Sequence, residues 1–211
     1  DKYSCKSYLR GLDYVKLAPD AFIRMGKDVD EFSAKTVEVR GLPLFVKPTN
    51  GGSSFGITKV TRAEDLPSAI KYAFKEGETV LVEKGIPSEH ELTCAVYNDG
   101  TGVRALPIIE IISETGWFDY DAKYNGLSRE VCPAEVSDHL TLQIQDISRR
   151  LYRHLGCKGL VRMDFLTAPD GIYFLEVNII PGMTNASLVP KMVRAAGINF
   201  TDFLTQIIEN A

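Results

Sequence analysis

Long apolar runs and an excess of basic residues are both missing from this sequence. No stretch approaches the ~20 consecutive apolar residues of a membrane-spanning helix, so we expect no transmembrane segment and no membrane partner. Lys and Arg number 24 against 28 Asp and Glu, a net charge of -4. That balance argues against a nucleic-acid partner, because nucleic-acid surfaces usually carry clustered basic residues. Hydrophobic residues make up 45%, which excludes disorder for most of the chain.

Cysteines are few and widely spaced. Cys5, Cys94, Cys132 and Cys157 contain no pair at the spacing of a zinc finger or a redox motif. A chain of 211 residues can build a core without disulfides, so we expect four reduced thiols and a cytoplasmic protein. The first residue is Asp1 and not Met, so we also expect the chain to be a piece of a longer protein.

Helical segments alternate with short apolar runs, which predicts an α+β or α/β fold in one large domain or two packed subdomains. Helices are expected over about 61–77, 137–154, 188–196 and 200–208. For the first, T-R-A-E at Thr61–Glu64 reads as a capping box, in which the two side chains cap the helix start. Strands are expected at Leu44–Pro48, Val80–Lys84, Glu91–Tyr97, Val103–Ile112, Leu160–Leu166 and Tyr173–Asn178.

A Gly/Pro/Ser break at Gly85–Ser88 is the best internal seam, so we divide the chain into subdomains 1–88 and 89–211. A polar, aromatic-rich segment without periodicity lies at 113–132. A loop of that length in a compact domain is usually functional, and we interpret it as a lid.

The segment Pro48–Gly56 is rich in glycine and serine and follows the strand that ends near Lys47. Small residues let backbone N–H groups approach an anion, the hydroxyls of Ser53 and Ser54 add donors, and the lysine adds charge. The segment is no Walker A loop, since no Gly-Lys-Ser/Thr follows. A hairpin loop and a phosphate cradle are about equally good readings of it.

Alternation along two strands groups polar side chains. In 160–166, Arg162 and Asp164 share a face; in 173–178, Glu176 and Asn178 share one, with Tyr173, Leu175 and Val177 opposite. If the strands are neighbours, Asp164, Glu176 and Asn178 converge as oxygen ligands, the set that suits Mg²⁺. A salt bridge from Arg162 to the two acids is the alternative.

Three further segments stand near these candidates. Gly182, in the N-I-I-P-G-M-T segment after Asn178, could offer an N–H to an oxyanion, or mark an ordinary Pro-Gly turn. E-K-G-I at Glu83–Ile86 could hold a ribose and an adenine face. Lys123 and Tyr124 lie in the predicted lid, which could equally be a protein-contact surface.

Taken together, the motifs resemble the ATP-grasp portion of the D-alanine–D-alanine ligase family over essentially the whole chain. The resemblance is carried by V-K-P with G-S-S-x-G, D-Y-x-A-K-Y, C-P-A, L-G-C-K-G, R-M-D, E-V-N and P-G-M-T. It implies an α+β, ATP-grasp fold in which two subdomains hold ATP between them. It also implies ligation of two D-alanines through an acyl phosphate, for peptidoglycan precursor synthesis.

The resemblance also assigns roles to individual residues. Nucleotide contacts are implied for Lys2, Lys47, Ser53, Ser54, Glu83, Lys84, Ile86, Glu91 and Lys123. Two Mg²⁺ or Mn²⁺ ions are implied on Asp164, Glu176 and Asn178. Catalytic or substrate contacts are implied for Ser53, Tyr120, Lys123, Tyr124, Arg162, Gly182, Ser187 and Leu188.

Two departures from the family pattern limit these implications. Ile179 stands where the family usually has Thr after the metal-binding Asn. The family's N-terminal domain, which positions the first D-alanine, has no counterpart in the sequence. The alternatives are a ligase for D-lactate or D-serine, which Tyr124 disfavours, and an ATP-binding module without turnover. For the full-length form the resemblance implies a homodimer.

Overall fold

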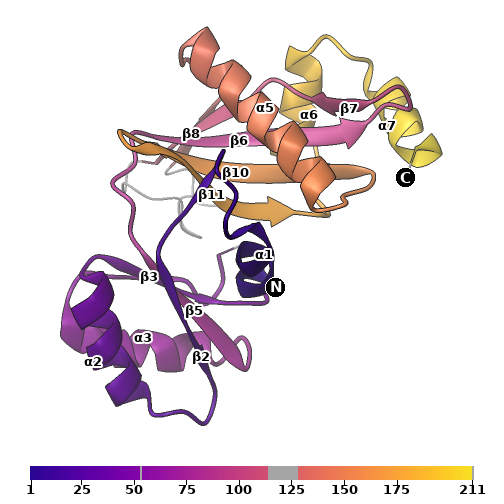
Figure 1. Cartoon of the computed structure of the whole chain (residues 1–211). Coiled ribbons are helices and arrows are strands. Elements are labelled where there is room, and N and C mark those ends of the chain that lie inside the picture. The colour runs from indigo at the N-terminus through magenta and orange to yellow at the C-terminus, as the bar shows by residue number, and fades with distance from the viewer. Residues whose placement is uncertain (53, 114–127, 211) are drawn as a thin grey trace. The chain divides into compact units, whose positions relative to one another are not determined.

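Contacts in the computed structural model divide the chain into two units, which we describe separately, with the labels of Figure 1. The structure describes residues 1–52, 54–113 and 128–210. Among them, unit 1 contains Asp1–Asp13 and Leu17–Pro87, and unit 2 contains Tyr14–Lys16, 88–113 and 128–210. The chain passes from unit 1 to unit 2 between Pro87 and Ser88, which lies in the Gly/Pro/Ser break noted in the sequence.

Unit 1 is built on a four-stranded antiparallel sheet with three helices. In sheet order the strands are β2 (Asp20–Arg24), β5 (Thr79–Lys84), β3 (Leu44–Pro48) and β4 (Thr58–Val60). The helices are α1 (Lys2–Leu9), α2 (Val29–Arg40) and α3 (Leu66–Ala73), the last preceded by a 3-10 turn, Ala63–Asp65. Alternation sends Leu44, Val46, Val80 and Val82 to one face, where they form a core with residues of α3. Figure 1 shows α2 and α3 together on this side of the sheet and α1 on the other.

Unit 2 is built on a larger antiparallel sheet, in the order β1-β11-β10-β6-β8-β9 with β7 beside β6. The strands are β1 (Lys16–Leu17), β6 (His90–Asn98), β7 (Val103–Ala105), β8 (Ile109–Ser113), β9 (Ser128–Val131), β10 (Leu160–Ala168) and β11 (Gly171–Asn178). Helix α5 (Asp138–His154) buries Ile144, Ile147 and Leu151 against one face (Figure 1). Helices α6 (Leu188–Ala195) and α7 (Phe200–Glu209) pack over Ala95, Tyr97, Ile109 and Ile111 of the opposite face.

The α+β class and most of the expected elements are confirmed. Helix α5 begins after Ser137, whose side chain accepts a hydrogen bond from the Leu140 N–H at 3.2 Å, and ends at His154 as expected. Helices α6 and α7 and the strands β3, β5, β6, β10 and β11 lie within two residues of their predicted bounds. All four cysteines are free thiols. No helix among the described residues is both long and apolar enough to cross a membrane.

Three local predictions are wrong. The expected capping box does not form: α3 begins at Leu66, where Pro67 suits a first turn, and Glu64 pairs with Arg62 instead. The strand expected over 103–112 is two strands, because Pro107 in the connection has no N–H for the ladder. The end of the predicted lid, 128–131, is strand β9. The prediction also lacked α1, α2, β1, β2 and β4.

Candidate functional site

One face of the sheet in unit 2 carries an apolar half and a polar half. Helices α6 and α7 cover the apolar half. In the polar half, Asp164 of β10 is the direct cross-strand partner of Glu176 of β11, and Arg162 is the partner of Asn178. Cross-strand partners in an antiparallel pair have their Cβ atoms about 5 Å apart on the same face. The register therefore brings together the four side chains that the sequence grouped.

Arg162 and Asp164 form a two-point ion pair within this polar half. The guanidinium donates from Nε to Asp164 Oδ1 and from a terminal nitrogen to Oδ2, both at 2.9 Å. Thr93 of β6 donates to the same Oδ1 at 2.6 Å. Asp164 is only 7% exposed, so its carboxylate is held in one orientation. The salt bridge that the sequence left as an alternative thus exists between Arg162 and Asp164.

The charge of Arg162 is secured by its acidic surroundings. Burial by itself lowers the pKa of Arg162, but the negative charges of Asp164, Glu176 and Glu130 outweigh burial and raise that pKa. Glu130 lies on β9 and also pairs with Lys191 of α6. A permanently charged guanidinium among carboxylates can bind an oxyanion on its remaining N–H groups.

A β-bulge lies beside this group and corrects part of the predicted alternation. Phe165 pairs with Phe174 while Asp164 pairs with Glu176, so Leu175 has no partner on β10. The extra residue reverses the alternation beyond it. Phe174 is therefore buried against Phe165, with ring centroids 6.1 Å apart. Tyr173, expected opposite Glu176, pairs with Leu166 and shares the face of Asp164.

The turn after β11 is fixed by the hydroxyl of Ser187, the residue before α6. Ser187 Oγ accepts a hydrogen bond from the Thr184 N–H at 3.1 Å and lies 2.8 Å from the Thr184 hydroxyl. A Cβ on Gly182 would come within 2.8 Å of the same Ser187 Oγ. Gly182 and Ser187, both predicted substrate contacts, therefore lie side by side. Leu188, also predicted, is largely buried at the start of α6, whereas Ile179 is 69% exposed.

Unit 1 carries a second group of predicted residues, on the sheet face opposite its core. Lys47 of β3 forms an ion pair with Glu83 of β5 at 2.6 Å, and Glu83 also pairs with Lys6 of α1. Burial alone raises the pKa of Glu83, but the charges of Lys47 and Lys6 outweigh burial and lower the pKa to about 2. Glu83 is therefore a carboxylate at neutral pH. The described structure brings together Lys47 and Glu83 from different strands.

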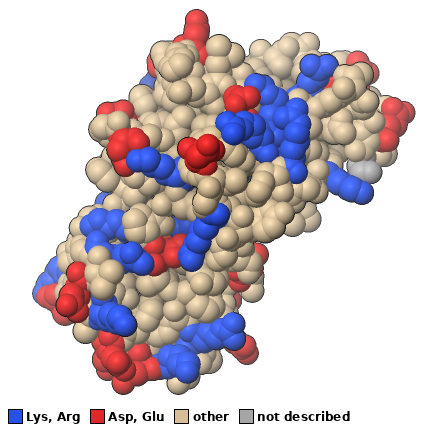
Figure 2. All heavy atoms as spheres, in the orientation of Figure 1, with Lys and Arg blue, Asp and Glu red and all other residues tan. Residues whose placement is uncertain are grey.

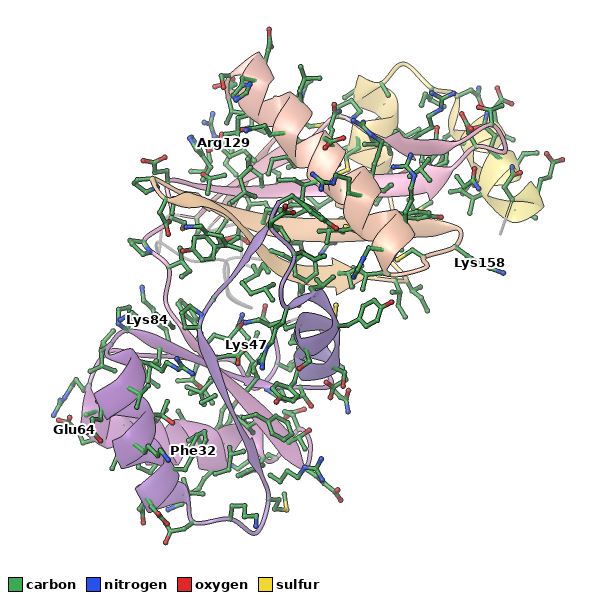
Figure 3. The ribbon with its side chains drawn as sticks, in the orientation of Figure 1. Phe32, Lys47, Glu64, Lys84, Arg129 and Lys158 are labelled. Atoms are coloured by element: carbon green, nitrogen blue, oxygen red, sulfur yellow. The ribbon has the colours of Figure 1, made fainter. Side chains whose placement is uncertain are left out.

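The other predicted nucleotide contacts lie in different surroundings. Lys84 alternates with Glu83, and its Nζ donates to the Leu42 carbonyl at 2.6 Å (Figure 3). Figure 3 shows Lys84 and Lys47 on different parts of unit 1. Ile86 is half-buried in the connection that follows β5. Glu91 belongs to unit 2, on β6, where it pairs with Leu166 and Ile111.

The glycine- and serine-rich segment connects β3 to β4 as a hairpin loop. Lys2 lies against it: its N–H donates to the Thr49 carbonyl at 2.8 Å and its Nζ to the Gly51 carbonyl at 3.1 Å. Ser54 has φ of 60°, the left-handed region that few non-glycine residues adopt. Such conformations recur at ligand sites. The hairpin reading is confirmed, and the phosphate cradle stays a prediction.

Four predicted site residues, Ser53, Tyr120, Lys123 and Tyr124, lie outside the described residues. Across the part that the structure describes, no three His, Cys, Asp or Glu side chains group as a metal centre. The predicted metal set has two such residues, and Asn178 is the third ligand. That set therefore stays a prediction.

Three residues near these groups were missed in the sequence. Thr93 could have been found, because alternation from Glu91 places it on the polar face. Lys6 and Glu130 could not, since neither α1 nor β9 was predicted. Basic residues also gather over α5, as Figure 2 shows, although the chain is acidic overall. Within α5, the guanidinium carbon of Arg150 lies 3.5 Å from the centroid of the Tyr14 ring, and Arg149 pairs with Asp146.

The two α+β units, each built on an antiparallel sheet with a charged group on one face, share their fold with solved ligases of the ATP-grasp class, and the chain is a member of that class. The family described as "D-ala D-ala ligase C-terminus" matches residues 9–209. The chain therefore belongs to that family.

Curated relatives that match the whole chain are named D-alanine–D-alanine ligase. A D-alanine–D-alanine ligase of Azobacteroides pseudotrichonymphae is 44% identical over 212 residues, covering 100% of this chain and 64% of the relative. One from Bacteroides thetaiotaomicron is 43% identical with the same coverage. The chain thus spans about 64% of the length of these curated relatives.

Solved structures of the family superpose closely. The D-Ala:D-Ser ligase VanG from Enterococcus faecalis matches with a TM-score of 0.84 and 33% identity, over 99% of this chain and 60% of that one. A D-alanine–D-alanine ligase from Bacillus anthracis complexed with ATP matches with a TM-score of 0.81 and 29% identity, over 99% and 64%.

Proposed function

We propose that this chain carries the ATP-dependent machinery of a ligase that joins two D-alanines into D-alanyl-D-alanine for peptidoglycan precursors. The observation that carries the proposal is the register of β10 and β11, which sets Asp164 against Glu176 and Arg162 against Asn178. Membership of the family and the full coverage of the chain by D-alanine–D-alanine ligases support it.

The reaction needs activation of a carboxylate, since a carboxylate and an ammonium form a salt and not an amide. The γ-phosphoryl group of ATP is transferred to a carboxylate oxygen of the first D-alanine, and ADP leaves. The amine nitrogen of the second D-alanine then attacks the carbonyl carbon of this acyl phosphate. The new C–N bond forms, the bond to phosphate breaks, and the nitrogen loses its proton.

Arg162 is the residue we assign to the developing oxyanion. Its pairing with Asp164 uses Nε and one terminal nitrogen, which leaves the other terminal nitrogen's donors for a substrate oxygen. Because Asp164 and Thr93 are themselves hydrogen-bonded, the guanidinium is oriented before substrate binds. The Gly182 N–H is the second donor, and Ser187 and Leu188 line the place of the second D-alanine.

The residues present fit Mg²⁺ or Mn²⁺. Asp164, Glu176 and Asn178 offer hard oxygen donors on one sheet face, and these three would hold the ions. When bound, the ions neutralise charge on the transferring phosphoryl group. Lys47 and Glu83, with the cation-rich surroundings of unit 1, are assigned to the nucleotide. A homodimer stays a prediction.

Two measurements test the proposal. Calorimetric titration of the chain with ATP and Mg²⁺ should give saturable binding, and no binding would refute the nucleotide part. Chromatographic detection of the ligated product, a dipeptide with D-alanine or D-serine and an ester with D-lactate, tests the ligation, and D-alanine is expected to give the most product. Preference for D-serine would align the chain with the VanG relative. ATP binding without ADP formation would mean that these residues bind nucleotide without ligating.

A further inference from the structure

Lys6 is a buried cation for which the reaction above has no use. It lies on α1, is only 1% exposed, and belongs to none of the predicted site residues. Lysine is almost never fully buried unless its charge is paired. Here the Nζ donates to the Ala18 carbonyl at 2.9 Å, pairs with Glu83, and lies 3.2 Å from Asp20 Oδ2. Three acceptors match the three donors of an ammonium group.

The Glu83 carboxylate is divided between two lysines. Lys6 binds Oε1 and Lys47 binds Oε2, the latter at 2.6 Å. The two cations come from different elements, since Lys6 lies on α1 and Lys47 on β3. Glu83 therefore cannot rotate without losing one ion pair. Because each lysine binds a different carboxylate oxygen, Lys47 contacts Oε2 and does not have to bridge both oxygens of Glu83.

The sheet register shows that two carboxylates, and not one, have to be neutralised on this face. Asp20, Glu83 and Phe45 are direct neighbours across β2, β5 and β3, so two carboxylates lie side by side on one face. Lys6 lies between these two acids and neutralises their mutual repulsion. Without Lys6, Lys47 would be the one cation left on Glu83 among the contacts of the described residues, facing two carboxylates that lie side by side.

We propose that Lys6 is a positioning residue for nucleotide binding, which acts through Glu83 to hold Lys47 with its charge available to a phosphate. The inference rests on the proposed function, in which Lys47 and Glu83 contact the nucleotide. A purely structural ion pair is the competing role, because removing one partner of any buried pair destabilises a protein.

A double-mutant cycle separates the two roles. The variants are Lys6→Met, Glu83→Gln and the double variant, and the readout is the ATP dissociation constant of the folded chain by calorimetry. Lys6→Met should weaken ATP binding by about tenfold, within the range for removing a supporting partner. In the Glu83→Gln background the same change should leave the dissociation constant within about twofold, because Lys6 acts only through Glu83.

Matched controls keep the result interpretable. Arg10→Met removes the other cation on Asp20, at 2.7 Å, and touches no atom of Glu83 in the described contacts, so ATP affinity should not change. If Lys6→Met does not fold, Lys6→Arg replaces it in the cycle, because it keeps the charge but cannot reproduce the contacts of the ammonium group, and the same tenfold weakening of ATP binding is expected only in the background with Glu83.

The pH profile is a readout that stability alone would not move. Around Glu83 the charged groups are Lys6 on α1, Lys47 on β3 and Asp20 on β2. Between pH 7.5 and 5.5 the wild-type affinity should be flat, while that of Lys6→Met should fall with pH as the less compensated Glu83 protonates. Equal affinity in wild type and Lys6→Met, or the same loss in both backgrounds, would overturn the inference. No ATP binding by the wild type would instead refute the proposed function.

Discussion

The charged groups of the two units are opposites in composition. In unit 1, Lys6 and Lys47 surround Glu83, so two cations share one carboxylate. In unit 2, Asp164 and Glu176 act on Arg162, so the acids outnumber the cation. The carboxylates of both groups lie on antiparallel strands, in unit 1 on the face opposite the core and in unit 2 on the polar half of the face that α6 and α7 cover. Strand alternation builds either arrangement equally well.

The difference teaches what each group can bind. A cluster with two lysines has positive charge to share with an anion such as a phosphate. A cluster rich in carboxylates has oxygen lone pairs to share with a hard cation. The same backbone geometry thus suits an anion in one unit and a hard cation in the other, and only the side chains differ.

Replacing the acids of unit 2 is expected to have the largest effect. Under the proposed function, Asp164→Asn or Glu176→Gln should lower ligase turnover by at least about 100-fold, because the ions that these acids would hold would no longer neutralise charge on the transferring phosphoryl group. ADP release in a coupled assay measures the loss, and circular dichroism checks the fold. Asp170→Asn is the matched control, since Asp170 lies in the turn between the same strands and pairs with Lys16. Normal turnover in Glu176→Gln would contradict the assignment of Glu176 as a metal ligand in unit 2.

Replacing the acid of unit 1 should instead cost stability. Glu83→Gln leaves Lys6 and Lys47 without their shared carboxylate in a buried place. The expected loss in the free energy of unfolding is roughly 3–5 kcal/mol, as for other broken buried pairs. Urea unfolding followed by circular dichroism measures it. An effect as small as that of Arg10→Met, whose partner Asp20 keeps Lys6, would show that the cluster contributes little.

Acid should weaken unit 1 through the same residue. The pKa of Glu83 is lowered to about 2 from an ordinary 4.5, so its contribution to stability is complete above about pH 4.5. That contribution is lost as pH falls from 4.5 towards 2 and amounts to about 3 kcal/mol. The stability gap between wild type and Glu83→Gln should therefore shrink over this window, as measured by urea unfolding at each pH. A constant gap would contradict the lowered pKa.

Filling the turn after β11 should have the smallest effect. Gly182→Ala places a Cβ about 2.8 Å from Ser187 Oγ, so the hydroxyl must move away from Thr184. We expect a roughly tenfold rise in KM for the acceptor amine and little change in KM for ATP, because only the acceptor side is displaced. Steady-state kinetics with each substrate varied gives both values. Gly102→Ala is the control, since its Cβ would meet no atom within 4 Å.

The polar face of unit 2 could be predicted from the sequence because its signal is local. Period-two alternation in β10 and β11 placed Arg162 with Asp164 and Glu176 with Asn178, and antiparallel pairing of consecutive strands did the rest. Helix α5 was equally readable, from the Ser137 cap and one apolar stripe.

The ion pair between Lys6 and Glu83 in unit 1 could not be predicted, because its two residues come from distant parts of the chain. Lys6 and Glu83 are 77 residues apart, and Lys6 lies on a short helix without a clear apolar stripe. The false capping box at Thr61–Glu64 shows the converse error, since a local motif gave way to Pro67 and to the Arg62 ion pair.

Leu175, which has no partner on β10, shifts the alternation of side chains along β11 by one residue. Before it, Phe174 belongs to the buried aromatic pair with Phe165; after it, Glu176 and Asn178 face Asp164 and Arg162. The residue of β11 that packs in the buried aromatic pair and the residues that belong to the polar group therefore follow different alternations, which meet at Leu175. Deleting Leu175 would force a choice, in which either the aromatic ring or the acid turns to the wrong side. The length of this segment is thus constrained even where the identity of the bulged side chain is not.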